Sequence, residues 1–169
     1  MKLNAIAVAN YIIDLAAQNE KELKQFGLMK RVYLTHGFCL ATLDRGALDP
    51  RFDVVEAWKN GPCIPSVYHS FKYNGNDSIK EKAVIVHFNT KRGEVEIETP
   101  ELLDVEIKDI ANRVWKRYID FSDKDLVELL HRKGTPWELC YVEGQNRPIP
   151  DLYTKTFYQK VLDYEYDKK

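Results

Sequence analysis

The stretch Ala57–Gly75, AWKNGPCIPSVYHSFKYNG, decides the local fold, because it concentrates prolines, glycines and aromatic residues in a short segment. A continuous helix is excluded at Asn60-Gly61-Pro62, since the residue before a proline is pushed out of the α region and Pro62 has no N–H to donate. Pro65 suits the first turn of a new helix, where its missing N–H would be unpaired in any case. The stretch therefore predicts a rigid turn followed by a short aromatic helix that stops at Asn74-Gly75.

Two interpretations of this stretch are open at the level of sequence. Trp58, Tyr68 and Phe71 are large aromatic residues of the kind that carry much of a core's apolar area, which favours a buried corner. A rigid aromatic platform also suits a preformed surface for a binding partner, because little conformational entropy is lost on binding.

The composition is that of an ordinary globular chain of 169 residues, and we expect one domain over residues 1–169. The net charge of −1 and the pI near 6.4 give no basic field, so no nucleic-acid or membrane partner is expected. Cys39, Cys63 and Cys140 are few and widely spaced, which predicts reduced thiols and a cytoplasmic location. Asn10 and Asp14 interrupt the first apolar run, which therefore reads neither as a signal peptide nor as a membrane span.

Helical periodicity, caps and breakers predict the long helices. Asn4 is a favourable N-cap, and the helix after it is so apolar that we expect it in the middle of the fold. Gly37 lies inside the second helix at a cost of about 1 kcal/mol relative to alanine, so a close neighbour is expected there. Residues 163–169 read as a charged, frayed tail. The predicted helices are residues 5–17, residues 28–43, one opened by Pro100-Glu101, one after the capping box Ser122–Asp125, and residues 152–162 with Tyr153, Phe157, Tyr158 and Val161 facing inward.

A β-hairpin is predicted at about residues 83–98, because the apolar period changes to two. Val95 and Ile97 face one way, and the opposite face carries an acidic row. Two strands alone are marginally stable, so we expect the hairpin to lean on the helices or to pair with an extended segment such as Phe52–Val55. The expected fold is mainly α, a single compact helical domain of about five or six helices with a small inserted hairpin. The acidic row consists of Glu94, Glu96 and Glu98.

The sequence offers little catalytic or metal-binding chemistry. Cys63 lies six residues before His69, but a cysteine between rigid positions is better explained as a buried residue than as a nucleophile. His36 and Cys39 share a helix face, yet no second pair with metal-ligand spacing accompanies them. Phosphate-binding glycine loops and hydrolase motifs are absent from the sequence. We therefore expect no enzyme activity, no cofactor and no metal.

Three segments resemble the Panacea domain, the SocA-like antitoxin family. Residues 28–37, LMKRVYLTHG, are similar to its LxKLLYxxHG helix, and residues 56–68, EAWKNGPCIPSVY, match its EAWxxGPVxPxVY signature. Residues 126–137, LVELLHRKGTPW, resemble its LSxxTHxxGxPW element. The segment 84–97 is longer and more strand-like than is typical of the family, so this chain could make its own contacts there.

The resemblance implies a mainly α-helical antitoxin that neutralises a toxin encoded beside it by direct protein contact, often on a prophage or mobile element. An alternative implied by the family is an adaptor that presents a toxin or host protein to an AAA+ protease. An orphan phage protein that binds a host target is a further alternative. The oligomeric state is left open.

The site residues divide into a structural group and a partner-binding group. Aromatic–proline corners fix the direction of the chain, so the structural group is expected to hold the fold. The structural group is Trp58, Gly61, Pro62, Pro65, His131, Pro136 and Trp137. The partner-binding candidates are Lys59, Asn60, Tyr68, His69 and Lys72 in the signature, with Glu94, Glu96 and Glu98 in the hairpin for partner choice through charge complementarity.

Overall fold

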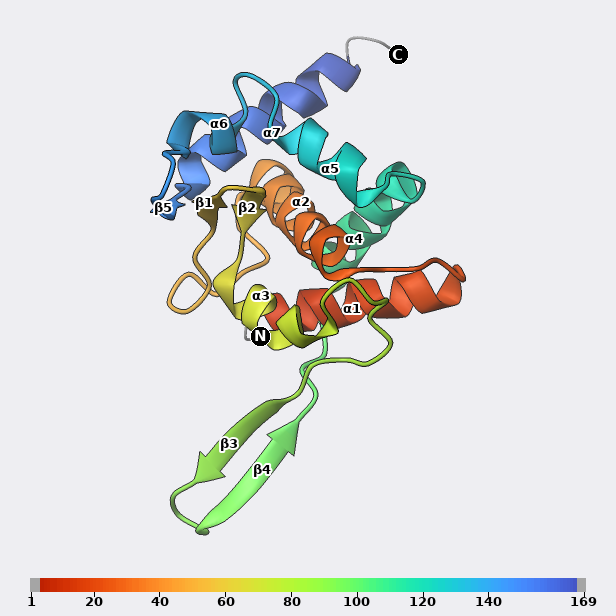
Figure 1. The fold of residues 1–169 in the computed structure, drawn as a ribbon, viewed down its shortest axis with the longest axis vertical. Helices are drawn as coiled ribbons and strands as arrows, with labels where there is room; N and C mark the ends of the chain where they lie inside the picture. The colour runs from red at the N-terminus through yellow and green to blue at the C-terminus, as the bar shows by residue number, and fades with distance from the viewer. Residues whose placement is uncertain (1–3, 167–169) are drawn as a thin grey trace.

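A computed structural model describes residues 4–166 of the chain, and its helices are grouped around one central helix, α2 (Figure 1). The described part is mainly α-helical with two small antiparallel sheets, which confirms the predicted fold class. No helix in this part is long and apolar enough to cross a bilayer. The elements are α1 (Ala5–Gln18), α2 (Gln25–Leu43), β1 (Glu56–Trp58), β2 (Gly61–Cys63), α3 (Pro65–Phe71), the 3-10 turn η1 (Lys72–Asn74), β3 (Ile85–Asn89), β4 (Glu94–Glu98), α4 (Val105–Tyr118), α5 (Asp123–Leu130), α6 (Pro136–Cys140), β5 (Arg147–Pro148) and α7 (Asp151–Tyr166).

The centre of the fold is α2 and not α1, which corrects the expectation from sequence. Every residue from Gly27 to Leu40 is buried, and α2 packs against α1, α3, α4, α5 and α7. The first helix is also largely buried, but it lies beneath α2 and contacts α2, α3 and α4 (Figure 1). Lys30 and Arg31 interrupt the apolar pattern of α2 in the sequence, yet both side chains are buried.

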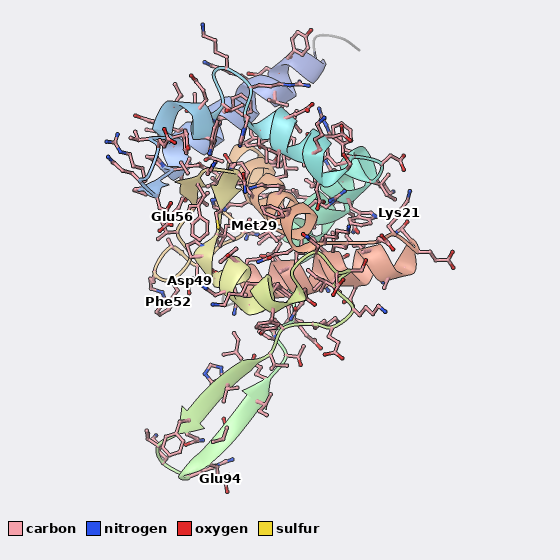
Figure 2. All side chains as sticks on the ribbon, in the orientation of Figure 1. Lys21, Met29, Asp49, Phe52, Glu56 and Glu94 are labelled. Atoms are coloured by element: carbon pink, nitrogen blue, oxygen red, sulfur yellow. The ribbon has the colours of Figure 1, made fainter. Side chains whose placement is uncertain are left out.

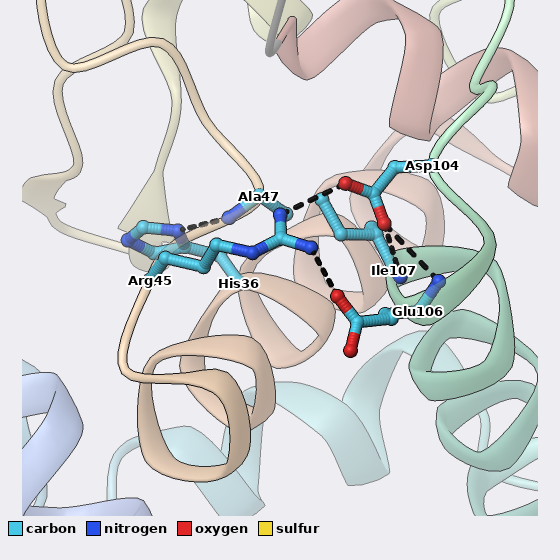
Figure 3. A network of polar contacts seen from close by, with 6 residues as sticks. All are labelled: His36, Arg45, Ala47, Asp104, Glu106 and Ile107. Carbon is cyan, nitrogen blue, oxygen red and sulfur yellow. Dashed lines mark hydrogen bonds and ion pairs between the residues drawn. The ribbon is translucent and has the colours of Figure 1, made fainter. Parts of the chain in front are cut away.

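The starts of α1 and α5 follow local capping signals, whereas α2 begins at Gln25 with no side-chain cap and not at the predicted residue 28. Among the helices with a predicted start signal there is one exception. Asn4 caps α1 through its side chain, and Ser122 and Asp125 form the predicted capping box at α5. The exception is α4, which begins at Val105 and not at Pro100-Glu101. Its N-cap is Asp104, whose Oδ1 accepts hydrogen bonds from two backbone amides, and Arg45 pairs with the same carboxylate at 2.9 Å (Figure 3).

The signature stretch forms a tight hairpin rather than a plain turn. β1 pairs with β2 in the register Trp58↔Gly61, and β5 pairs with the other edge of β1 in a β2-β1-β5 sheet. Gly61 has a φ of 99°, a conformation that residues with a side chain rarely adopt. Pro65 opens α3 as predicted. Strands of three residues are too short for their alternation to be visible in the sequence.

The β3–β4 hairpin stands away from the body below α1, which corrects a second expectation (Figure 1). It forms a separate two-stranded sheet and does not pair with Phe52–Val55. Phe52 lies in a turn with its ring exposed (Figure 2). The helices cover neither of the hairpin's faces, since the strand residues are exposed or only partly buried.

The last helix, α7, is longer than predicted, and fewer of its aromatic side chains are buried than the sequence predicted. α7 runs to Tyr166, so residues 163–166 of the predicted frayed tail are helical, and residues 167–169 of that prediction lie outside the described part. Tyr158 is buried against α2, where a β-carbon on Gly37 would overlap its ring. This contact confirms the close neighbour predicted for Gly37. Tyr153 was expected to face inward, but its side chain is 46% exposed.

Replacing Gly37 by alanine is expected to lower the free energy of unfolding by about 1–3 kcal/mol, because the new β-carbon overlaps the Tyr158 ring in a packed interior. The loss outweighs the better helix propensity of alanine, which amounts to about 1 kcal/mol. Chemical denaturation followed by far-UV circular dichroism measures the difference.

A double-mutant cycle with Tyr158→Ala provides the control. Once the ring is removed, Gly37→Ala is expected to become neutral or to stabilise the protein by up to about 1 kcal/mol. An equal loss in both backgrounds would show that the ring is not what excludes a side chain at this position.

Candidate functional site

The three sequence motifs meet at one place, which we call the signature corner. The Lys30 ammonium donates a hydrogen bond of 2.8 Å to the Pro62 carbonyl, which joins the first motif to the second. The Trp137 indole N–H donates a bond of 2.7 Å to the Trp58 carbonyl, which joins the second to the third. The signature corner consists of Lys30, Trp58, Gly61, Pro62, Tyr68, His131, Pro136, Trp137 and Tyr141.

Aromatic rings form most of the contacts in this corner. The His131 imidazole stacks on the Trp137 indole with ring centroids 3.7 Å apart and an interplanar angle of 2°. Tyr141 also stacks on Trp137, with ring centroids 4.6 Å apart and an interplanar angle of 20°. Trp58 meets Tyr68 edge to face at 4.9 Å. The corner is a closed aromatic cluster, with Trp137 buried in its centre.

A buried lysine determines the electrostatics of the corner. Burial lowers the pKa of Lys30 from 10.5 to about 8, opposed by the nearby Cys63 and Asp123. Burial raises the pKa of the Cys63 thiol to about 12, so this cysteine is protonated at neutral pH. Burial and the Lys30 charge both lower the pKa of His131, and its Nε2 has no hydrogen-bond partner in residues 4–166.

The residue pairs considered for catalysis or metal binding are separated or already engaged. Cys63 is buried, whereas His69 is exposed with its ring against Tyr68. His36 is bonded through both ring nitrogens: Nε2 lies 3.0 Å from the Asp151 carboxylate, and Nδ1 accepts a bond from the Ala47 amide (Figure 3). Within residues 4–166, no three His, Cys, Asp or Glu side chains are grouped as a metal site would require.

The partner-binding candidates of the signature lie on the surface of the corner. Lys59 and Asn60 are exposed at the tip of the β1–β2 turn, and His69 and Lys72 are exposed on α3 and η1. Tyr68 is half-buried, and its ring packs against Trp58. Of the structural group, Gly61, Pro62, Pro136 and Trp137 are buried, and Trp58, Pro65 and His131 are half-buried.

The β3–β4 hairpin has one apolar face and one polar face. Cross-strand pairs Val86↔Ile97 and Phe88↔Val95 lie on one side, and His87↔Glu96 lies on the other. The apolar side chains are 52–69% exposed, so this face is open to solvent along its length. We call it the apolar hairpin face, formed by Val84, Val86, Phe88, Val95 and Ile97.

The predicted acidic row lies on the polar face of the hairpin. Glu94 is near the tip, and all three glutamates are exposed (Figure 2). Glu98 lies 3.4 Å from His87, and Glu96 accepts a bond from Asn89. The row and the signature corner are on opposite sides of α1, so the structure does not bring the two groups of candidates together (Figure 1).

The base of the hairpin is fixed by the polar stripe of α1. Buried Asn10 donates to the carbonyls of Ala83 and Pro100, both at 3.0 Å, and accepts a bond from the Ala83 amide. One turn further, Asp14 pairs with Lys82 at 2.8 Å. The two chain segments that enter and leave the hairpin are therefore held together at α1, while the strands beyond them extend into solvent.

The acidic row is exposed, as the sequence predicted, but the exposure of the apolar hairpin face was not predicted. Alternation placed Val95 and Ile97 on one side correctly, but that side was expected to pack on the helices. The strand period shows which residues share a face and gives no information on what covers it. Asn10 and Asp14 were a usable signal, since a polar stripe on a buried helix must meet polar groups elsewhere.

These features define a helical domain with a closed signature corner and a projecting hairpin, and the comparisons with known proteins give its family. Residues 28–138 match the family described as "Antitoxin SocA-like, Panacea domain". The chain belongs to this antitoxin family. A curated relative, "Antitoxin SocA" of Caulobacter vibrioides (strain NA1000 / CB15N), is 32% identical over 137 residues, which cover 81% of this chain and 70% of the relative. No solved structure matches the chain.

The buried lysine makes stability depend on pH in a defined direction. Between pH 8 and 10.5 the unfolded chain holds a proton on Lys30 that the folded chain has lost, so the free energy of unfolding rises with pH in this window. Between pH 8 and 10.5, the free energy of unfolding of the wild-type protein is expected to rise by about 3 kcal/mol relative to that of Lys30→Met.

Denaturation curves of both proteins at matched pH values measure this gain, since all other titrating groups are shared. Lys133→Met, at an exposed lysine, is the control and should show no such trend. If the difference in free energy of unfolding between the wild type and Lys30→Met does not change up to pH 10.5, Lys30 keeps its ordinary pKa in the folded protein.

Proposed function

We propose that this chain is a cytoplasmic antitoxin that neutralises a toxin protein encoded beside it through direct contact, and that the β3–β4 hairpin supplies the main contact surface. Membership of the antitoxin family supports a toxin as the partner in general. The choice of the hairpin rests on one observation, the apolar hairpin face that the rest of the chain leaves uncovered.

An uncovered hairpin of this kind is unusual for a protein that acts alone. A two-stranded hairpin is marginally stable in water, and contiguous exposed apolar area is typical of protein-interaction sites. Phe88 and Ile97 would supply the buried anchors of such an interface. Tight binding needs roughly 1,200–2,000 Å² of total buried area, so neighbouring surface must join the hairpin in the complex.

Charge and backbone both add specificity to this surface. The polar face carries the exposed carboxylates of Glu94, Glu96 and Glu98, which complement a basic partner, although Arg92 lies 4.0 Å from Glu96. Both hairpin edges carry unpaired backbone groups, because within residues 4–166 strands β3 and β4 pair only with each other. A toxin segment can add to such an edge as a further strand, with alternate side chains reaching the apolar face.

The signature corner is proposed to hold the fold rather than to choose the partner. Lys30 bonds to Pro62, Trp137 bonds to Trp58, and these contacts join the three motifs, as a shared scaffold requires. The group proposed to hold the fold is Trp58, Gly61, Pro62, Pro65, His131, Pro136 and Trp137. Lys59, Asn60, Tyr68, His69 and Lys72 are proposed as secondary contacts. We place the gene on a prophage or other mobile element, in keeping with the family resemblance.

The test is rescue from the toxin. Phe88→Ser with Ile97→Ser is expected to weaken binding to the toxin by about a hundredfold or more, since two anchors lose their apolar burial. Growth of cells that co-express the neighbouring gene measures neutralisation, and titration of the purified pair measures the affinity. The melting temperature should stay near that of the wild type, because neither side chain belongs to the core.

Leu103→Ser is the matched control, because it removes an exposed leucine outside the hairpin and should leave rescue intact. Full neutralisation by the Phe88/Ile97 variant would show that the toxin contacts a different part of the chain. A neighbouring gene that is harmless when expressed alone would remove the antitoxin proposal itself. If the toxin protein accumulates only in cells that lack an AAA+ protease, the adaptor alternative is favoured over occlusion.

A further inference from the structure

A second uncovered surface lies at the opposite end of the molecule from the hairpin. A groove of about 1130 Å³ runs along α7 and is closed on its other side by α6 and the turn before it. It exceeds the usual size of a small-molecule pocket and follows α7 from Leu152 to Tyr164, about 18 Å at the rise of an α-helix. We call it the α6–α7 groove.

The floor and walls of the groove are apolar. Leu139, Leu152 and Tyr164 are each more than 60% exposed, and Phe157 and Val161 lie between them. On α7 these residues recur at helical spacing on a face different from the one that places Tyr158 against α2. The helix therefore has a second apolar face, which the fold covers only in part, since Phe157 and Val161 are half-buried against the core.

The charged residues that line the groove are all basic. Arg117, Lys133 and Lys160 line it, and none of the lining residues is acidic. Within residues 4–166, Lys133 and Lys160 form no hydrogen bond or ion pair, whereas Lys155 on the same helix pairs with Asp44. The groove thus combines an apolar floor with two ammonium groups that lack counter-charges, one on each side.

From this complementarity we propose that the α6–α7 groove docks an amphipathic α-helix of a partner protein, with an apolar face for the floor and carboxylates for Lys133 and Lys160. The walls are helices and offer no strand edge, so the occupant is a helix packed ridge into groove. Three turns of such a helix fill the length from Leu152 to Tyr164. The site is separate from the hairpin and carries the opposite charge.

The test is a selection of peptides on the full chain. A displayed library of 16-residue helical peptides, with apolar residues fixed on one face and the flanking positions randomised, is expected to converge on Glu and Asp at the flanks. Fluorescence anisotropy of selected peptides then gives affinities for purified variants. Lys133→Glu with Lys160→Glu should weaken the acidic peptides at least tenfold and shift a repeated selection towards Lys and Arg.

Lys24→Glu with Lys80→Glu is the matched control, because it makes the same change in net charge at exposed lysines outside the groove. It should leave the affinity within twofold of the wild type, as should Phe88→Ser with Ile97→Ser in the hairpin. Leu152→Ser should weaken every selected peptide without lowering the melting temperature. The proposal fails if no acidic flank is enriched, if both lysine pairs behave alike, or if the groove mediates a concentration-dependent dimer that Lys133→Glu abolishes.

Discussion

The hydrogen bond from the Lys30 ammonium to the Pro62 carbonyl is the contact on which the arrangement of this fold depends. A buried cation is costly unless it is paired or hydrogen-bonded, so the helix that carries it dictates where its neighbours lie. Arg31 repeats the constraint one residue later, with bonds to the carbonyls of Tyr118 and Phe121. Two adjacent cations of α2 thereby hold the β1–β2 turn on one side and the end of α4 on the other.

The same constraint explains how a solvated hairpin is attached to a close-packed body. Asn10 is buried in α1 and satisfies its amide with the backbone at Ala83 and Pro100. Polar groups in a core thus serve as anchors for segments that leave the core. The Asn10 hydrogen bonds lie at the base of the hairpin, so the base is fixed while the side chains of β3 and β4 face solvent. Such an arm can change its surface residues without disturbing the packing around α2.

Local signals in the sequence predicted local structure well. Asn4, the Ser122–Asp125 box and Pro65 start helices where expected, because each acts on backbone groups within a few residues. The start of α4 was missed because Asp104 competes with the proline signal and gains Arg45 as a partner distant in sequence. Long-range placement was less visible: Lys30 and Arg31 interrupt the apolar pattern of α2, and their burial depends on carbonyl groups distant in sequence, which that pattern does not reveal. Periodicity likewise identified apolar residues that share a face in the hairpin and in α7, but the expectation that the fold covers them was wrong for Val95, Ile97 and Tyr153, which are exposed.

The two surfaces that the fold leaves uncovered differ in charge and lie at opposite ends of the molecule (Figure 1). The hairpin carries an exposed apolar face and a row of three glutamates, with Lys91 and Arg92 in its turn, whereas the α6–α7 groove is lined by apolar and basic residues. A basic partner suited to the glutamates of the hairpin is disfavoured at the basic groove. The two proposed sites are therefore expected to select different molecules. Because the sites do not overlap, occupation of one leaves the other accessible. A protein that only occludes a toxin needs one such surface, whereas one that brings a toxin to a second protein needs two, and the proposed groove supplies the second.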